Sequence, residues 1–594
     1  MSKTLPGVQE SWKSLSYWAN PERMRQHEDK VLIILTLTIA AAVGLVVVAF
    51  ILLTENLGSR MYPSGGAAWR RLVVPVLGSL ITGYLMKQHF PASRGSGIPQ
   101  TKAALFLEGG VIRLRTAVGK FCCASISLAS GIALGREGPS VQVGAGIAST
   151  FGRRLGFGAV NVKSLVPIGT AAALAAAFNT PIAAVLFTLE EVMGNLHARV
   201  LGTVVLSSAT SWMVLRLLLG DEPLFHVPTY QLVHPLEFAF YALLGVTGGM
   251  VSVSFVKLLL WLRKNFLRLP KWTEALQPVA GGLLVGVLGW FVPDVLGVGY
   301  SQVGRALNNQ IALGMMALLM VLKVVATAGC YASGNAGGIF GPSLFIGAMM
   351  GGAIGSAAHV ILPDYTGSVG AYALVGMGTA FAGIVRAPLT SVIMIFEVTR
   401  DYSIIVPLMI SNLISYLISS RLQKEPIYEA LSHQDGIYLP AGAREREEGI
   451  SVREAARPPG RIFPADDRVE TLYGKTDPKE SAWPVSGPSG FVGMLTVEKL
   501  REAAQQNRGS DRIGELIAPL RSSNAAGTET YPHVYMDEPI DSALGRMADA
   551  DLTVLPVLSR TDPGRLAGVL SLEDILAAYK SADRNKEKEP GERV

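Results

Sequence analysis

The hydrophobic and polar positions divide the chain into two very different parts. From residue 31 to about residue 420, long apolar runs alternate with short polar or glycine-rich breaks. The first run, Val31–Thr54, is long enough to cross the hydrocarbon core of a membrane as one helix. Further spanning helices are predicted at Leu201–Leu219, Phe238–Leu262 and Ile311–Ala328. The pattern predicts an all-α protein that crosses the bilayer many times.

Other apolar runs in this part are too short to cross a membrane alone, such as Ile182–Leu189 and Pro388–Phe396. Short segments interrupted by Gly and Pro are typical of transporter helices that stop near the middle of the bilayer. Irregular backbone at that depth is tolerated where it lines a cavity or is buried in protein. These segments therefore predict broken helices around a binding site.

The composition becomes polar after Arg421, and the region from there to Val594 is predicted to be a soluble α/β region. At the other end, residues 1–30 are polar and indicate a cytoplasmic, partly amphipathic segment rather than a signal peptide. The final SADRNKEKEPGERV is expected to be disordered because it is charged and almost without apolar residues.

The membrane part contains an internal repeat. GREGPSVQVGA from Gly135 matches GIFGPSLFIGA from Gly338 with six identities in eleven positions. GTAAALAAAFNTPIAAVLFTLEE from Gly169 matches GMGTAFAGIVRAPLTSVIMIFEV from Gly376, and GSGIPQ matches GVGYSQ. The three matches occur in the same order, which indicates a duplicated membrane half. Duplicated halves related by a pseudo-twofold axis are a transporter architecture.

Polar residues that only one half carries are candidates for chemistry. They are Ser96 against Val298, Glu137 against Phe340, and Glu191 against Val398. Glu190, in contrast, matches Glu397, so it is expected to belong to the shared scaffold or to a solvated helix end.

GSGIP, GREGP and GGIFGP share one physical device. Each places Pro at or near a predicted helix start, where its missing N–H costs nothing. The free N–H groups and the positive end of such a helix attract an anion, and glycines let the backbone approach it closely. The alternative is that these breaks are ordinary kinks and packing contacts, but three of them together favour an anion site.

Two side chains in these motifs suit that site. Ser96 is a candidate hydroxyl donor to the anion, unless it bonds back to its own helix. Ionised Glu137 would occupy the anion site and, when protonated, would leave it; the alternative is a salt bridge with Arg136, although adjacent residues seldom face each other on a helix. Glu191 is the candidate proton acceptor on the inner side.

Composition agrees with a membrane protein that carries a polar appendage. Only 16% of the residues are charged, against about 25% in an average soluble domain, and the mean hydropathy is +0.36. The net charge of +6 is modest and suits a membrane topology better than a nucleic-acid partner. Cys122, Cys123 and Cys330 show no disulfide or metal spacing, and no metal site is expected. G-x-S-x-G and H-E-x-x-H motifs are absent, so an enzyme is not expected.

From Val31 to Ala430 the chain resembles the CLC family of chloride channels and chloride/proton antiporters, on the strength of GSGIP, GREGP, FNTPIAAVLFTLEE and GGIFGPSLFIG. The resemblance implies an inverted repeat of broken, tilted helices. It also implies a homodimer in the cell membrane, with its own anion path in each subunit and with cytoplasmic termini.

The resemblance also implies roles for individual residues. The hydroxyls of Ser96 and of Tyr428, in EPIYEAL, would contact the central chloride, together with the backbone amides of Ile339 and Phe340.

Backbone amides of Arg136 and Gly138 would serve an outer chloride site. Glu137 matches the family's external gating glutamate and Glu191 its internal proton glutamate. Similar antiporters keep both glutamates and many channels of the family lack the inner one, so Glu191 favours coupled exchange over an uncoupled channel. Ser96 favours chloride, since nitrate-preferring members carry Pro there.

The polar tail contains two related units, WPVSGPSGFVGMLTVEKL from Trp483 and LPVLSRTDPGRLAGVLSLEDIL from Leu555. Each predicts a strand, a turn, a second strand and a helix. They resemble a CBS-domain pair, regulatory modules that often bind adenine nucleotides. Asp574 matches the family's ribose-binding Asp, but the first copy has Lys499 there, so a structural or dimerising tail is an equal alternative.

The predicted organisation is therefore a chain of seven segments. They are an N-terminal segment (1–30), two membrane halves (31–225 and 226–430), a linker (431–455), two CBS-like domains (456–510 and 511–582) and a tail (583–594). The function predicted is exchange of chloride for protons, with an uncoupled chloride channel as the nearest alternative. A membrane-anchored regulatory protein whose membrane part is inert is the rival from another class.

Overall fold

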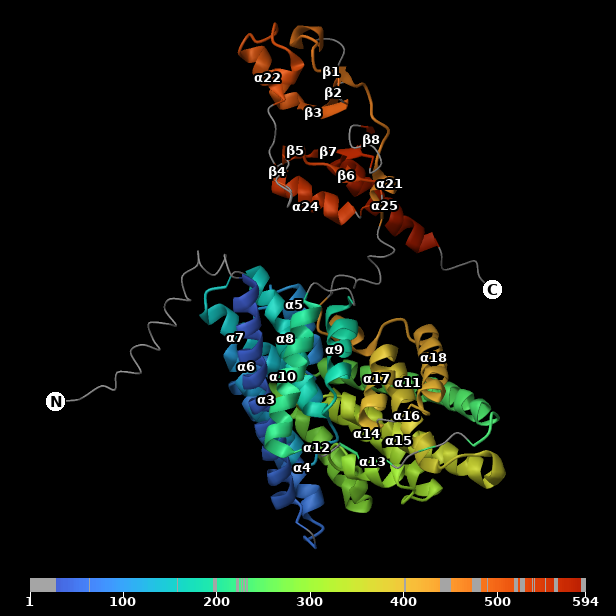
Figure 1. Ribbon diagram of the computed structural model, residues 1–594. Helices are drawn as coiled ribbons and strands as arrows, with labels where there is room; N and C mark the ends of the chain where they lie inside the picture. Colours follow the sequence, from blue (N-terminus) through green and yellow to red (C-terminus); the bar gives the residue numbers. More distant parts are fainter. Residues whose placement is uncertain are drawn as a thin grey trace, which may run out of the picture. The chain divides into compact units, whose positions relative to one another are not determined.

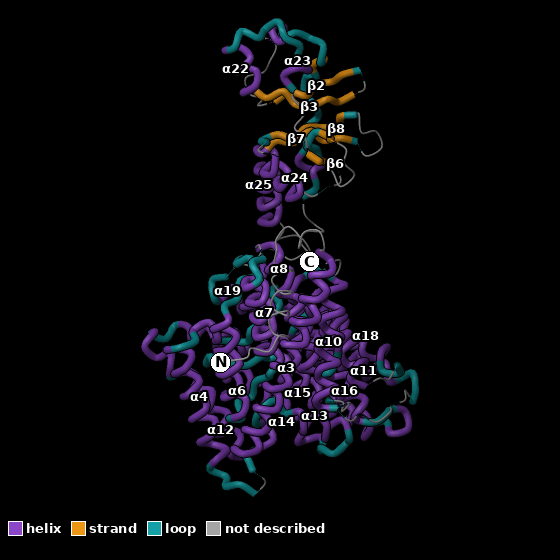
Figure 2. The backbone as a smooth tube through the Cα atoms, turned by 60° about the vertical axis from the view of Figure 1, so that its left-hand side comes forward, coloured by secondary structure: helices purple, strands orange, loops and turns teal. Residues whose placement is uncertain are grey.

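The computed structural model describes residues 28–588 except 64, 158, 196–199, 221–223, 226, 228–229, 231–232, 400–401, 438–449, 473–481, 489, 518–521, 524–528, 537, 539, 551 and 560–564. The chain forms two compact units, Met1–Pro440 and Ala441–Val594. The first is a body of packed helices and the second contains small β-sheets with helices beside them (Figures 1 and 2).

The helices of the first unit fall into two matching series. The first series is α3 (Glu28–Met61), α4 (Arg70–Gln88), α5 (Ile98–Phe106), α6 (Leu114–Ala129), α7 (Glu137–Arg154), α8 (Ala159–Phe178), α9 (Pro181–Phe187) and α10 (Leu201–Leu219). The second is α11 (Glu237–Leu267), α12 (Gln277–Phe291), α13 (Tyr300–Leu307), α14 (Leu313–Ala332), α15 (Phe340–Ile361), α16 (Val369–Ile384), α17 (Pro388–Thr399) and α18 (Ile405–Leu422), followed by α19 (Ile427–Gln434). The order corresponds pair by pair, as the sequence repeat predicts.

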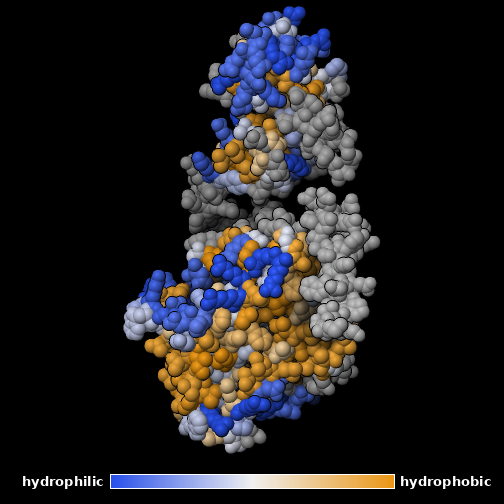
Figure 3. All heavy atoms as spheres, turned by 90° about the vertical axis from the view of Figure 1, so that its left-hand side faces the viewer, coloured by the Kyte–Doolittle hydropathy of each residue, from blue (hydrophilic) through white to orange (hydrophobic). Residues whose placement is uncertain are grey.

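Six helices among the described residues are long and apolar enough to cross a membrane. They include α3, α10, α11 and α14, so the spanning helices predicted from the apolar runs are confirmed. A broad hydrophobic band runs across the face of this unit shown in Figure 3, with hydrophilic residues above and below it. This distribution is that of an integral membrane protein.

The predicted broken helices are also confirmed. Helix α9 has seven residues and α17 has twelve, and both begin at a proline. The three glycine-rich motifs each lead into a helix start, at Ile98, Glu137 and Phe340.

A pair of backbone hydrogen bonds joins the two halves at equivalent positions of the repeat. The amide of Gly135 donates to the carbonyl of Gly338 (2.6 Å), and the amide of Gly338 donates to the carbonyl of Gly135 (2.7 Å). Because equivalent residues exchange bonds with each other, a local pseudo-twofold axis passes between them. Helices α7 and α15 begin next to this crossing and lead toward opposite ends of the unit (Figure 1).

The same symmetry appears in how the helices pack. A Cβ on Gly144 would lie 2.3 Å from the carbonyl oxygen of Gly169, and a Cβ on Gly347 would lie 2.2 Å from that of Gly376. Glycine is therefore required where α7 crosses α8 and where α15 crosses α16. Small residues at such crossings are a common means of packing helices in a membrane.

The shared glutamates of the repeat cap helices across the pseudo-twofold axis. Glu397 of α17 accepts hydrogen bonds from the amides of Ile182 (2.9 Å) and Ala183 (2.7 Å) at the start of α9. Glu190 accepts in the same way from the amides of Leu389 (3.3 Å) and Thr390 (2.8 Å) at the start of α17. The expectation that Glu190 belongs to the scaffold is confirmed, and the alternative of a merely solvated helix end is wrong.

Two buried lysines also form a repeat-related pair. Lys120 Nζ donates to the carbonyls of Ser93 (2.9 Å) and Gly95 (2.6 Å), in the loop before α5. In the other half, Lys323 Nζ donates to the carbonyls of Val295 (3.1 Å) and Gly297 (2.5 Å), in the loop before α13. Each lysine fixes the loop that leads into the first residue of a short helix.

The second unit contains two copies of one small topology. In the first copy, β1 (Phe463–Pro464) pairs parallel to β2 (Ala482–Gly487), which pairs antiparallel to β3 (Gly490–Thr496), and α22 (Val497–Gln505) follows. In the second copy, β6 (Val534–Tyr535), α24 (Ile540–Ala550), β7 (Val554–Leu558), β8 (Leu566–Ser571) and α25 (Leu572–Lys588) repeat the arrangement. The remaining elements are α21 (Val452–Ala455), α23 (Ile513–Leu516), β4 (Ser522–Ser523) and β5 (Glu529–Thr530).

Burial moves the expected limits of these small domains. Ile513 and Ile517 belong to the first core, so the first domain continues past the predicted boundary at residue 510. Val452, placed in the linker from the sequence, belongs to the second core. Helix α25 includes residues 583–588 of the expected tail, while residues 1–27 and 589–594 lie outside the described residues.

Replacing Glu397 by Ala removes the acceptor for both amides at the start of α9. We expect the free energy of unfolding to fall by about 1–2 kcal/mol, the upper range for loss of a capping side chain. Thermal unfolding of the purified protein in detergent measures the effect, and Glu190→Ala should lose a similar amount. Glu108→Ala, which removes an exposed carboxyl group just after α5, is the matched control. A melting temperature of Glu397→Ala equal to that of the control would contradict the capping role.

Candidate functional site

Three helix starts converge around Ser96. Ser96 is fully buried and lies two residues before α5. A Cβ on Gly138, the second residue of α7, would lie 2.5 Å from Ser96 Oγ, and a Cβ on Gly338 would lie 3.0 Å from the amide nitrogen of Gly138. The starts of α5 and α7 and the loop into α15 therefore meet at one place. Positive helix ends and unpaired amides make such a place favourable for an anion.

Two buried hydroxyl groups at this place have no hydrogen-bond partner within the described residues. They are Oγ of Ser96 and Oη of Tyr428, the second residue of α19, which packs against α5. The alternative that Ser96 bonds back to its own helix is therefore wrong. Leaving a buried polar group unpaired costs about 1–3 kcal/mol, so orphaned groups require an explanation. An anion that accepts from both hydroxyls supplies one.

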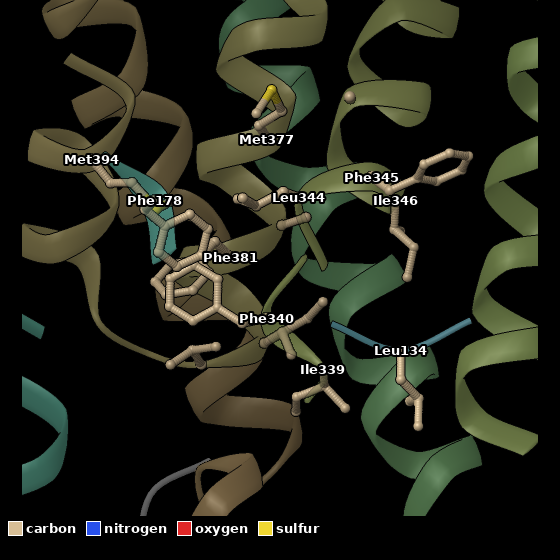
Figure 4. Close-up of a cluster of buried hydrophobic side chains, with 14 of the residues drawn as sticks. Leu134, Phe178, Ile339, Phe340, Leu344, Phe345, Ile346, Met377, Phe381 and Met394 are labelled. Atoms are coloured by element: carbon tan, nitrogen blue, oxygen red, sulfur yellow. The ribbon is translucent and has the colours of Figure 1, made fainter. Parts of the chain in front are cut away.

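Phe340 forms an apolar wall of the site. It is the first residue of α15 and Ile339 is the cap residue before it, so amides of both stand at the helix start. The ring of Phe340 lies 4.4 Å, between centroids, from the rings of both Phe178 and Phe381. Figure 4 shows Phe178, Phe340 and Phe381 in one cluster of buried side chains. Amide–anion attraction is stronger beside such a buried apolar wall than in water.

Glu137 is the carboxylate nearest this crossing. It is the first residue of α7 and is fully buried. One carboxylate oxygen accepts a hydrogen bond from the hydroxyl of Tyr300, and the other accepts from the amide of Gly341 at 3.2 Å. An acid side chain thus binds to the start of α15, where the sequence places an anion.

Arg136 does not pair with its neighbour Glu137. Its guanidinium forms an ion pair with Glu55 of α3 (3.2 Å) and donates to the carbonyl of Ala177 (3.5 Å). The alternative of an Arg136–Glu137 salt bridge is therefore wrong, and the carboxylate of Glu137 is left to the anion region.

Glu191 lies in a second buried polar cluster. It belongs to a π-helical turn, Thr188–Met193, a feature that often marks functional sites. Only 7% of Glu191 is exposed, and it forms an ion pair with Lys102 of α5, which is equally buried (2.8 Å). Glu429 of α19 lies 3.9 Å from the same ammonium group.

Tyr428 links the two regions. Its hydroxyl is close enough to Glu137 and to Glu191 to interact electrostatically with both. The residues predicted to bind chloride and carry protons therefore lie together around α5, α7, α15 and α19.

Sequence reasoning missed two residues of this site, Tyr300 and Lys102. Comparison of the halves could have found Tyr300: in the match of GSGIPQ with GVGYSQ, Ser96 was selected against Val298, while Tyr300 stands against Ile98 in the same way. Two positions past the end of the same match, Lys102 stands against Gly304, but its partner Glu191 is 89 positions away and only the fold brings them together.

Asp574 is engaged within its own domain. One of its carboxylate oxygens accepts from the amide (2.9 Å) and hydroxyl (2.6 Å) of Ser571, at the start of α25. The other forms an ion pair with Arg457 at 2.6 Å. A ribose at this place would share the carboxylate with Arg457, whose side chain is 63% exposed.

Comparisons with known proteins agree with this geometry. A family model described as voltage gated chloride channel matches residues 78–420, and a CBS-domain model matches residues 527–581. The chain is 33% identical over 397 residues to a Ralstonia nicotianae protein named as a candidate chloride channel, ClcB-like, covering 66% of this chain and 89% of the relative.

Two further similarities concern exchange transporters. The chain is 33% identical over 362 residues to the H(+)/Cl(-) exchange transporter ClcA of Vibrio campbellii, covering 59% of this chain and 76% of the relative. Among solved structures, a slow cyanobacterial Cl-/H+ antiporter superposes with a TM-score of 0.64 at 25% identity, covering 68% of this chain and 97% of that one.

Replacing Lys102 by Met should destabilise the protein strongly. It leaves the buried carboxylate of Glu191 without its counter-charge, and breaking a buried ion pair in this way costs about 3–5 kcal/mol. Thermal unfolding should show a large loss for Lys102→Met, most of which is recovered in the double variant Lys102→Met/Glu191→Gln. Lys271→Met, at an exposed lysine, is the control. If the double variant is as unstable as the single one, the ion pair is not the reason.

Proposed function

This chain belongs to the voltage gated chloride channel family, and we propose that it exchanges chloride for protons across a cell membrane. The observation that carries the proposal is the place of Glu137. Its buried carboxylate binds the start of α15, where helix ends and amides would otherwise bind an anion. The similarity to proteins named as H(+)/Cl(-) exchange transporters supports it.

Chloride would bind next to the orphaned hydroxyls. Ser96 and Tyr428 each offer one O–H donor to a central chloride, and the amides of Ile339 and Phe340 would add two more donors. The backbone amides of Arg136 and Gly138 at the start of α7 would hold a second chloride toward the outside. None of these donors carries a full charge, which permits binding that is firm yet reversible.

Glu137 would act as both gate and proton carrier. When ionised, it competes with chloride for the amides at the start of α15. When protonated, it loses the charge that holds it there, leaves the path and lets chloride pass. Since a negative ion and a proton then move in opposite directions, the exchange is electrogenic.

Glu191 would receive protons from the inner side and pass them toward Glu137. Its ion pair with Lys102 compensates the charge of the buried carboxylate, and Tyr428 is close enough to both glutamates to interact electrostatically with each. Chloride and protons would thus share the outer part of the path and follow separate routes toward the inside.

An uncoupled chloride channel is the second candidate, because a relative with 33% identity is named as a candidate channel. In a channel the same Glu137 would open and close the path without carrying a proton across. Chloride flux with no accompanying proton movement would establish this alternative.

We also propose a homodimer whose termini and CBS tail are cytoplasmic. Arg501 is exposed on α22, so Arg501→Cys provides a probe for a membrane-impermeant thiol reagent. Labelling only after the cytoplasmic side is opened supports this orientation, and labelling of intact cells contradicts it.

Whether the tail binds an adenine nucleotide through Asp574 is tested by calorimetry with ATP, where no heat of binding would favour a structural tail.

The decisive experiment uses purified protein in liposomes loaded with chloride and diluted into low-chloride buffer, with the voltage clamped by valinomycin. External chloride and pH are recorded together. Proton uptake driven by chloride efflux is expected for the natural protein. Glu137→Gln should keep chloride flux and reduce proton flux to the level of empty liposomes, because an amide cannot carry the proton.

Glu108→Gln, at an exposed carboxyl group, is the matched control and should keep both fluxes. Proton coupling that persists in Glu137→Gln would remove Glu137 from the proposed role.

A further inference from the structure

Tyr300 is bonded directly to the proposed gate. It is the first residue of α13, and its hydroxyl donates to the carboxylate of Glu137. Gly341 is the other donor to that carboxylate, and a Cβ on Gly341 would lie 3.2 Å from the Tyr300 hydroxyl oxygen. Tyr300 and Gly341 therefore hold Glu137 from two different elements of the second half.

The ring of Tyr300 is held by a cationic contact and an aromatic contact. The guanidinium of Arg136 lies 5.3 Å from the ring centroid, and the ring of Phe225 packs against it edge-on at 5.8 Å. Arg136 is itself anchored by Glu55 at 3.2 Å. The hydroxyl is thus aimed by an aromatic and a cationic contact that do not involve the gate.

The backbone beneath Tyr300 is fixed as well. Lys323 binds the carbonyls of Val295 and Gly297 in the loop that leads into α13. Gly299, the cap residue, has a φ of 90°, a conformation that other residues rarely adopt. Because both ring and backbone are held, the hydroxyl meets the carboxylate with little loss of freedom.

We propose that Tyr300 is a positioning residue that holds the ionised Glu137 in the anion path and thereby sets how strongly chloride must compete to displace it. The inference rests on the proposed gating role of Glu137. A hydroxyl donor stabilises a carboxylate more than a neutral carboxylic acid, because a charge-assisted hydrogen bond is roughly twice as strong as a neutral one. Tyr300 therefore holds the ionised carboxylate of Glu137 in the anion path and holds it less strongly once that carboxylate is protonated.

The asymmetry of the repeat agrees with this role. The position equivalent to Tyr300 in the first half is Ile98, which cannot donate a hydrogen bond, and the position equivalent to Glu137 in the second half is Phe340. The carboxylate and its hydroxyl donor thus come from opposite halves, and neither is duplicated. The hydrogen-bonded pair of Tyr300 and Glu137 therefore has no counterpart at the repeat-related positions.

The test is Tyr300→Phe, which keeps the ring and removes only the hydroxyl. Chloride uptake into liposomes is measured against external chloride concentration at fixed pH. We expect the concentration for half-maximal uptake to fall roughly tenfold, the equivalent of one charge-assisted hydrogen bond. Tyr402→Phe, at a tyrosine that is 77% exposed, is the matched control and should leave this concentration unchanged.

A second comparison, made in the Glu137→Ala variant, distinguishes loss of the hydrogen bond to Glu137 from a general packing effect of the substitution. In Glu137→Ala the hydroxyl has no carboxylate to hold, so adding Tyr300→Phe should change the half-maximal concentration less than twofold. An equal fall with and without Glu137 would show a structural effect and overturn the proposal, as would no fall in the natural background. Because chloride uptake is recorded directly, the comparison remains valid if the protein proves to be a channel, and failure of coupling is recognised separately from the pH record.

Discussion

The hydrogen-bond pair between Gly135 and Gly338 is the constraint on which the remainder of the membrane unit depends. A backbone that leaves helical geometry inside a bilayer has amides and carbonyls that lipid cannot satisfy. Here two such stretches satisfy each other at 2.6 and 2.7 Å. The pairing fixes the places where α7 and α15 begin, and those two helix starts provide most of the candidate anion site.

Further hydrogen bonds around that axis also satisfy backbone groups at the broken helices. Lys120 and Lys323 satisfy the carbonyls of the loops before α5 and α13, and Glu190 and Glu397 satisfy amides at the starts of α17 and α9. These groups thus meet partners that come from the other half or from an adjacent loop. Within the described residues the hydroxyls of Ser96 and Tyr428 have no such partner, and both belong to the candidate anion site.

Much of this arrangement could be predicted from the sequence, because it depends on local rules. Apolar run length predicts the spanning helices, Gly and Pro predict the helix starts, and the repeat predicts the two-fold relation. The comparison of halves also selected Ser96, Glu137 and Glu191, all three of which the fold buries.

What escaped prediction depends on contacts between distant segments. The partner of Arg136 could not be predicted from its neighbours in the sequence, because Glu55, which the fold brings within 3.2 Å, lies on the distant helix α3. The limits of the CBS domains moved for a similar reason, since burial of Val452 and Ile517 is decided by packing and not by local composition. Tyr300 lay inside a recognised motif, yet its role becomes visible only when α13 is placed beside α7.

The crossed capping of α9 and α17 has a consequence for the order in which the protein is made. Translation proceeds from the N-terminus, so α9 and the Gly135 loop enter the membrane roughly two hundred residues before Glu397 and Gly338 exist. Until then their amides and carbonyls lack the partners found in the finished fold. The first half consequently lacks these hydrogen bonds until the second half has been synthesised, and the length of the repeat sets that delay.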